Sequence, residues 1–163
     1  MNSRLQGVLE PRSTRVRNAV LMAALFVAYV FSARLGIDLP GAHGVVTPVW
    51  APTGIALVAL VLYGPGLWPA VALGALVANS TSGASVPEAA LISIGNTLEA
   101  VVGSMLLQRV GFRPALDRVR DVFALVVFGA IVSTAIAATN GVTTLWAFDD
   151  ISMSNYPSEW LLW

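Results

Sequence analysis

The chain has 163 residues, of which 56% are hydrophobic and only 11% charged, and its mean hydropathy is +0.76. An ordinary soluble domain has about 25% charged residues, so this composition excludes a soluble globular enzyme. The net charge is zero and there is no cysteine, which excludes disulfides, thiolate metal sites and a cysteine nucleophile. A single histidine cannot supply two axial ligands to a haem. We therefore expect no metal, no cofactor and no nucleic-acid partner.

Two long uncharged segments dominate the sequence. No Asp, Glu, Lys or Arg lies between Asp38 and Glu88, and a second such run covers Val122 to Phe148. A bilayer can accommodate so much uncharged, apolar chain, whereas a water-exposed fold cannot. The sequence therefore predicts an all-α, polytopic transmembrane helix bundle.

The first segment combines a basic tail with an apolar run. Residues 1–17 contain four arginines and one glutamate, and the apolar run that follows resembles a signal peptide. That run is long for a signal peptide, however, and Phe31 stands where cleavage after Ala33 would need a small residue. We expect the segment to be retained as the first span.

The remaining spans follow from apolar runs and their boundary residues. Pro48 and Pro52 are tolerated near the start of a helix, Ser85-Val86-Pro87-Glu88 fits a capping box, and Asn140-Gly141 is expected to end a span. Residues 18–163 then form one transmembrane module with about five spans and the start of a sixth. The spans lie near residues 18–37, 45–63, 66–82, 86–108 and 122–139, with the sixth beginning near 157.

The distribution of arginines predicts the orientation. Eight of the nine basic residues lie either before the first span or just after the fourth, and the other loops are mostly acidic. Short arginine-rich loops stay in the cytoplasm, so the N-terminus is predicted to be cytoplasmic. The second group would anchor its connector on the anionic membrane surface or form a docking surface for a cytoplasmic partner; it comprises Arg109, Arg113, Arg118 and Arg120.

Small residues recur at a spacing of four within the predicted spans. Because lipid gives helices no hydrophobic reason to associate, small residues that allow close backbone approach supply much of the contact. The pattern predicts helix packing, with a homodimer as the alternative, at Gly74, Gly95, Gly103, Gly129 and Ser133. The tryptophans lie near predicted span ends, as an interfacial belt requires; they are Trp50, Trp68, Trp146, Trp160 and Trp163.

Glu99 is the most unusual residue, since it falls near the predicted membrane centre. A charged side chain there costs about 3 kcal/mol, so Glu99 must face the bundle, be protonated or have a partner. Asn96 and Gly103 share its face, and Arg34 is the basic side chain within reach of the membrane region. Two interpretations remain open: a buried carboxyl satisfied by neighbouring polar groups, or a ligand, cation or proton site.

A second cluster of unusual residues precedes the second span, where Trp50, Pro52 and Gly54 lie close together. Proline removes backbone donors and leaves carbonyls free, and irregular backbone at membrane depth is tolerated beside protein or a cavity. The cluster is therefore either a rigid helix start or part of a binding site. His43 nearby is interpreted as a loop histidine rather than a metal ligand.

Three separated motifs, at residues 47–57, 67–75 and 95–100, resemble the first membrane-associated sensor family (MASE, type one). The resemblance implies a bacterial inner-membrane sensory module, joined to a histidine kinase or a cyclic-di-GMP enzyme as cytoplasmic output. It also implies that the characteristic positions are Trp50, Pro52, Gly54, Asn96 and Glu99.

The chain departs from this family by ending as its sixth span begins, which predicts either a fragment of a longer receptor or a shortened product needing a partner chain. No catalytic motif is present, so we expect no enzymatic activity. The favoured interpretation is a sensory input module whose site includes Arg34, Trp50, Asn96 and Glu99. The alternatives are a small transporter or channel component, with Glu99 and Arg34 on the substrate or proton path, and a purely structural anchor.

Overall fold

The computed structural model describes residues 12–37 and 50–163, which are 82% helical and include no strand. The predicted all-α class is therefore confirmed. The basic tail up to residue 11, together with His43 and Pro48, lies outside the described residues. The helical elements are α1 (Arg12–Ile37), α2 (Ala51–Tyr63), the 3₁₀ turn η1 (Pro65–Leu67), α3 (Trp68–Ser80), α4 (Val86–Arg109), α5 (Val119–Ala124), the π-helix η2 (Leu125–Val132), α6 (Ser133–Ala147) and α7 (Tyr156–Leu162).

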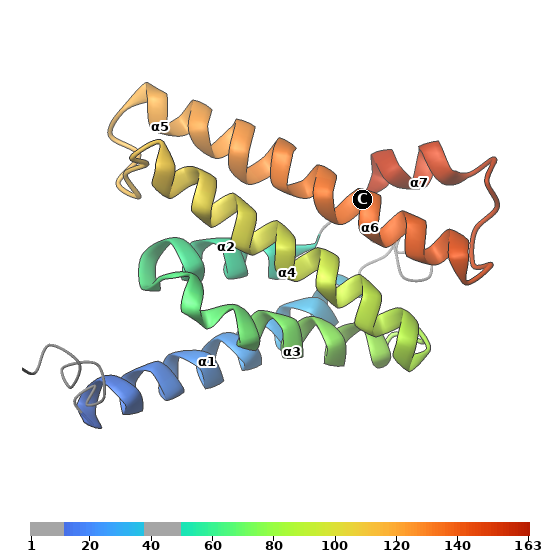
Figure 1. The fold of residues 1–163 in the computed structure, drawn as a ribbon, viewed down its shortest axis with the longest axis horizontal. Helices are drawn as coiled ribbons and strands as arrows, with labels where there is room; N and C mark the ends of the chain where they lie inside the picture. Colours follow the sequence, from blue (N-terminus) through green and yellow to red (C-terminus); the bar gives the residue numbers. More distant parts are fainter. Residues whose placement is uncertain (1–11, 38–49) are drawn as a thin grey trace, which may run out of the picture.

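Among the described residues, three helical segments are long and apolar enough to cross a membrane: Thr14–Gly36, Val86–Arg109 and Val119–Ala147. The last is one continuous run made of α5, η2 and α6. α4 is the central helix, since it packs against α2, α3 and α6 (Figure 1). The outer faces are apolar: Val20, Val27 and Phe31 on α1 are each more than half exposed. Such a surface suits contact with lipid rather than water.

The shorter helices differ in detail from the sequence prediction. α2 begins at Ala51, while residues 45–49 of the predicted second span lie outside the described residues. The last long helix does not stop at Asn140-Gly141 but continues to Ala147. Both residues lie in helix contacts, Asn140 against Gly95 of α4 and Gly141 against the ring of Trp163. Packing on both sides therefore outweighs the weak helix preference of Asn and Gly.

Local sequence signals explain two of the helix boundaries. α4 begins with the predicted capping box, in which the Ser85 amide donates to the Glu88 carboxylate at 3.0 Å. α7 begins at Tyr156 and folds back along α6 (Figure 1). There the Trp160 indole N–H donates to the Thr139 hydroxyl at 3.1 Å, and the hydroxyls of Tyr156 and Thr143 lie 2.9 Å apart.

Glycines mark the places where helices approach most closely. A Cβ built on Gly74 of α3 would lie 3.0 Å from the side chain of Tyr29 on α1. A Cβ on Gly103 of α4 would lie 3.0 Å from Leu57 and 3.2 Å from the Cβ of Ser133, and one on Gly129 would lie 3.0 Å from Leu57. The main buried core lies between α1, α2, α3 and α4, around Tyr29.

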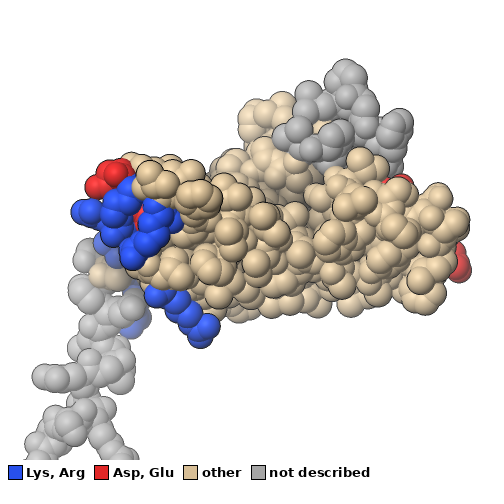
Figure 2. Space-filling model, turned by 90° about the horizontal axis from the view of Figure 1, so that it is seen from above, with Lys and Arg blue, Asp and Glu red and all other residues tan. Residues whose placement is uncertain are grey.

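Most of the exposed arginines gather at one end of the bundle. Figure 2 shows basic side chains gathered at one end, with the body of the visible face free of acidic and basic groups. The starts of α1 and α5 lie at this same end in Figure 1. The arginines near the start of α1 and those of the α4–α5 connector therefore share one end of the molecule.

Candidate functional site

The centre of the bundle contains a carboxylate that joins three helices. Glu99 lies about 20 Å from the start of α4 and about 15 Å from its end, and its side chain is 3% exposed. One carboxylate oxygen accepts a hydrogen bond from Thr53 of α2 at 3.1 Å, and the other accepts one from Thr134 of α6 at 2.8 Å. Two hydroxyl donors from two helices thus satisfy a carboxyl group at mid-depth.

The contact with Thr53 places the first turn of α2 at the middle of α4. α2 has 13 residues and a length of about 20 Å, too short to cross a bilayer, whose hydrocarbon core is about 30 Å thick. Trp50, the residue before the helix, makes no side-chain cap, and Pro52 in the first turn has no amide proton. The N-terminus of a helix has partial positive charge, so the Glu99 carboxylate stabilises this uncapped end. α2 is therefore a short helix, too short to span the core, whose N-terminus faces the carboxylate.

Three more polar side chains surround this point. Tyr29 of α1 is fully buried, and the side chains of Trp50 and Asn96 are its neighbours, with the charge of Glu99 also close. The Tyr29 hydroxyl, the Trp50 indole nitrogen and the Asn96 amide oxygen lie close to one another, but none meets ideal hydrogen-bond geometry with another described residue. A buried polar atom without a partner costs about 1–3 kcal/mol, so native cores contain few of them. We refer to these residues, Tyr29, Trp50, Thr53, Asn96, Glu99 and Thr134, as the polar cluster.

The polar cluster contains some of the residues predicted from the sequence and lacks others. Trp50, Asn96 and Glu99 are brought together, and Trp50 lies at mid-depth rather than at a span end. Pro52 is buried in the first turn of α2, whereas Gly54 is exposed and lies on a lipid-facing groove. Arg34 is exposed near the end of α1, and no ion pair joins it to Glu99 among the described residues.

Sequence reasoning missed three members of the cluster: Tyr29, Thr53 and Thr134. Tyr29 and Thr53 had visible signals, since Tyr29 is a polar residue within the first apolar run and Thr53 lies between Pro52 and Gly54. Thr134 had none, because threonines are frequent in that helix and two of its four bond to their own backbone. Thr139 and Thr144 donate to carbonyls four residues earlier.

The α4–α5 connector is held by its own ion pairs. The Arg118 guanidinium donates to both oxygens of the buried Asp121 carboxylate at 2.6 and 2.8 Å and to the Gly111 carbonyl at 2.9 Å. The hydrogen bond to Asp121 raises the pKa of Arg118 above its ordinary value. Arg113 pairs with Asp117 at 3.3 Å. Arg118 thus folds the connector, while Arg109, Arg113 and Arg120 are exposed at the same end of the bundle.

Comparison with known proteins adds one match. A family model, MASE1, matches residues 21–163 and so covers all members of the polar cluster. No curated protein and no solved structure matches the chain.

Proposed function

The chain belongs to the MASE1 family of membrane-associated sensory domains of signalling proteins, and we propose that it senses its stimulus within the membrane. In this proposal the polar cluster is the sensing site, the stimulus acts on it within the membrane, and the response passes to a cytoplasmic signalling output outside this chain. The output would be a histidine kinase or a cyclic-di-GMP enzyme, and the membrane would be the bacterial inner membrane with a cytoplasmic N-terminus.

The observation that supports this proposal most is the convergence of α2 and α6 on Glu99. A single carboxylate accepts one hydrogen bond from each of these helices, beside the buried polar groups of Tyr29, Trp50 and Asn96, which lack well-aligned partners among the described residues. A ligand, a proton or an ion acting there would alter the contacts of two helices at once. Intramembrane ionisable groups of this kind are rare and mark functional sites more often than structural ones.

The contact with α6 offers a route toward the arginine-rich end. Thr134 lies two residues after the end of the π-helix η2, and η2 is preceded by α5 and the connector. π-helical turns are rare and occur frequently at functional sites. A change at Glu99 would therefore reach an irregular helical segment that leads, through α5, to the connector.

The proposal can be tested by comparing two matched threonines in the native polypeptide. Thr134→Val removes a donor to Glu99, whereas Thr97→Val removes a buried hydroxyl that bonds only within α4, to the Ser93 carbonyl at 2.6 Å. An antibody against residues 1–17 isolates the polypeptide from its own membranes, its intact mass identifies any output domain, and autophosphorylation or cyclic-di-GMP turnover is then measured. We expect Thr134→Val and Glu99→Gln each to change this output about tenfold, the effect of about 1.4 kcal/mol.

Thr97→Val should leave the output within about twofold of wild type, since its hydroxyl does not contact Glu99. Trp50→Ala should resemble Glu99→Gln, because it removes a neighbour of Tyr29 from the same cluster. If Glu99→Gln, Thr134→Val and Trp50→Ala all signal normally at normal expression, the polar cluster is not the sensing site.

A further inference from the structure

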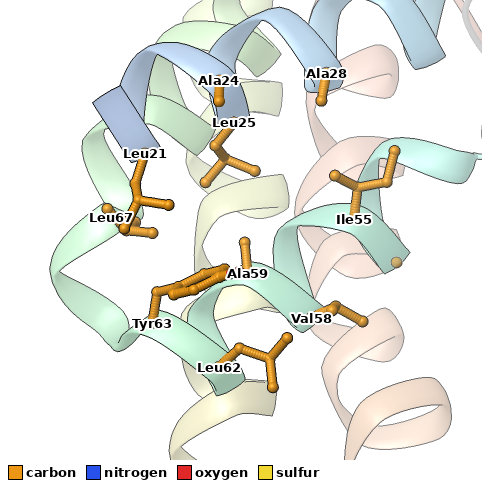
Figure 3. Close-up of a pocket in the computed structure, with 11 residues that line it drawn as sticks. Leu21, Ala24, Leu25, Ala28, Ile55, Val58, Ala59, Leu62, Tyr63 and Leu67 are labelled. Atoms are coloured by element: carbon orange, nitrogen blue, oxygen red, sulfur yellow. The ribbon is translucent and has the colours of Figure 1, made fainter. Parts of the chain in front are cut away.

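A predominantly apolar groove runs along the outside of the bundle between α1 and α2. Its volume is about 540 Å³, and its lining from α1 comprises Leu21, Ala24, Leu25 and Ala28. From α2 it includes Ile55, Val58, Ala59 and Tyr63, and Leu67 closes one end (Figure 3). Leu25 and Leu67 are buried and form its floor, whereas Val58, Leu62 and Tyr63 are more than half exposed at its rim. The groove therefore opens to the surroundings of the bundle.

One end of the groove lies toward the arginine-rich end of the molecule. α1 and α2 lie antiparallel here, so Leu21 is at the same end as Tyr63, and Ala28 is at the same end as Ile55 (Figure 3). Arg17 precedes Leu21 by four residues and therefore lies on the same face of α1, where its side chain is exposed. The exposed side chain of Arg17 therefore lies just beyond the end of the groove that faces the arginine-rich end of the molecule.

The length of the groove limits what can occupy it. Residues 54–63 of α2 extend about 14 Å, and the distance from Arg17 to Ala28 along α1 is about 16 Å. Half of a bilayer's hydrocarbon core is about 15 Å thick. A membrane-spanning helix docked on the bundle would need contact across the whole hydrocarbon core, whereas the acyl chain of a lipid in one leaflet ends at the bilayer midplane. The groove therefore matches an acyl chain in length and in apolar lining.

We propose that this groove binds a single anionic phospholipid from the arginine-rich leaflet, with one acyl chain between α1 and α2 and the headgroup phosphate at Arg17. Arginine near a membrane surface attracts anionic headgroups, and a lining that is apolar apart from the Tyr63 hydroxyl suits a hydrocarbon chain. The methyl end of the acyl chain would reach Gly54, where a Cβ would meet nothing within 4 Å. Gly54 is next to Thr53 of the polar cluster. This inference goes beyond the proposed sensory function and does not depend on it.

Native mass spectrometry of the full chain in mild detergent tests the proposal with two lipids of identical acyl chains, phosphatidylglycerol and phosphatidylcholine. We expect one phosphatidylglycerol to be retained per chain, and phosphatidylcholine to be retained less. Arg17→Gln should lower the preference for phosphatidylglycerol about fivefold, while Arg109→Gln, an exposed arginine at the same end but on α4, should not.

A second pair of variants separates the groove from the rest of the surface. Ala24→Phe places a ring in the groove, and Ala19→Phe places the same ring at an exposed position of α1 outside it. Ala24→Phe should reduce retention of both lipids at least fivefold, Ala19→Phe should not, and both should keep wild-type helicity by circular dichroism. Equal retention by the two variants would overturn the proposal. A wild-type dimer that Ala24→Phe converts to monomer would also overturn it, since the occupant would then be a second copy of the chain.

Discussion

Glu99 shows how one residue can connect helices that lipid alone would not hold together. Placing a charge at the membrane centre costs about 3 kcal/mol, and the two threonine hydroxyls offset part of this by donating to its carboxylate. The N-terminus of α2 contributes further, because its partial positive charge faces the same carboxylate. Burying the Glu99 charge alone would be unfavourable, but with its hydrogen bonds the residue helps to hold α2, α4 and α6 together.

Gly74 gives a prediction at this scale, because it allows α3 to approach the buried ring of Tyr29. Gly74→Leu should lower the free energy of unfolding by about 1–3 kcal/mol, the usual cost of overpacking a well-packed contact. Gly66→Leu is the control, since a Cβ at Gly66 meets nothing within 4 Å and should change the stability by about 0.5 kcal/mol or less. Denaturant-dependent circular dichroism in detergent micelles measures both variants. Equal stability of the two variants would contradict the close α1–α3 contact.

The sequence predicted those cluster residues that are rare in their surroundings and missed those that are common. An acidic group within an apolar helix and a Trp beside two prolines are conspicuous, so Glu99 and Trp50 could be found. Thr134 could not, because only the packing of α6 against α4 distinguishes it from other threonines. Arg34 was expected near Glu99 for its charge alone, but it is exposed, because long basic side chains near helix ends can reach the interface.

Among the elements, α2 and η2 depart from regular transmembrane helices. Hydropathy finds apolar segments but not their depth, so a helix too short to span the membrane can give the same signal as a full span. The π-helix of η2 is equally invisible, since Leu125–Val132 is an uninterrupted apolar run with one glycine. The capping box at Ser85, by contrast, depends only on local residues and was correctly predicted from the sequence.

The register of α4 against α6 can be checked because the chain contains no cysteine. A Cβ built on Gly103 lies 3.2 Å from the Cβ of Ser133, within a few tenths of an ångström of the separation in a disulfide. The double variant Gly103→Cys/Ser133→Cys should therefore form a disulfide under mild oxidation, which a mobility shift on non-reducing gels detects. Gly103→Cys/Ile131→Cys should not, because Ile131 is 61% exposed on another face. Cross-linking of the second pair alone would contradict the register.

For the whole molecule, the apolar composition and the separated charges established the class of the fold. Both arginine groups were predicted on one side of the membrane, and the starts of α1 and α5 do lie at one end of the bundle (Figure 1). The sequence could not give the arrangement of the helices around α4, because many pairings would bury the same small residues. Such pairings depend on contacts between residues far apart in the chain.

The proposed orientation predicts which loops are accessible from each side. In intact spheroplasts, an impermeant maleimide should label Ser154→Cys, in the loop before α7, but not Ala115→Cys, in the connector. After the membrane is opened, both should react, since both residues are exposed. Labelling of Ala115→Cys alone in intact cells would reverse the orientation and place the N-terminus outside.

The π-helix has a geometric consequence for the whole molecule. Each residue of an α-helix turns the chain by about 100°, and a π-turn holds one residue more than an α-turn. If the position of the π-turn moves along η2 by one turn, the residues between its old and new positions rotate about the helix axis. The residues on either side keep their places. Such a shift would change which residues of this helix face α4, while the rest of the helix stays in place. No charged group has to travel through the bilayer for that to happen.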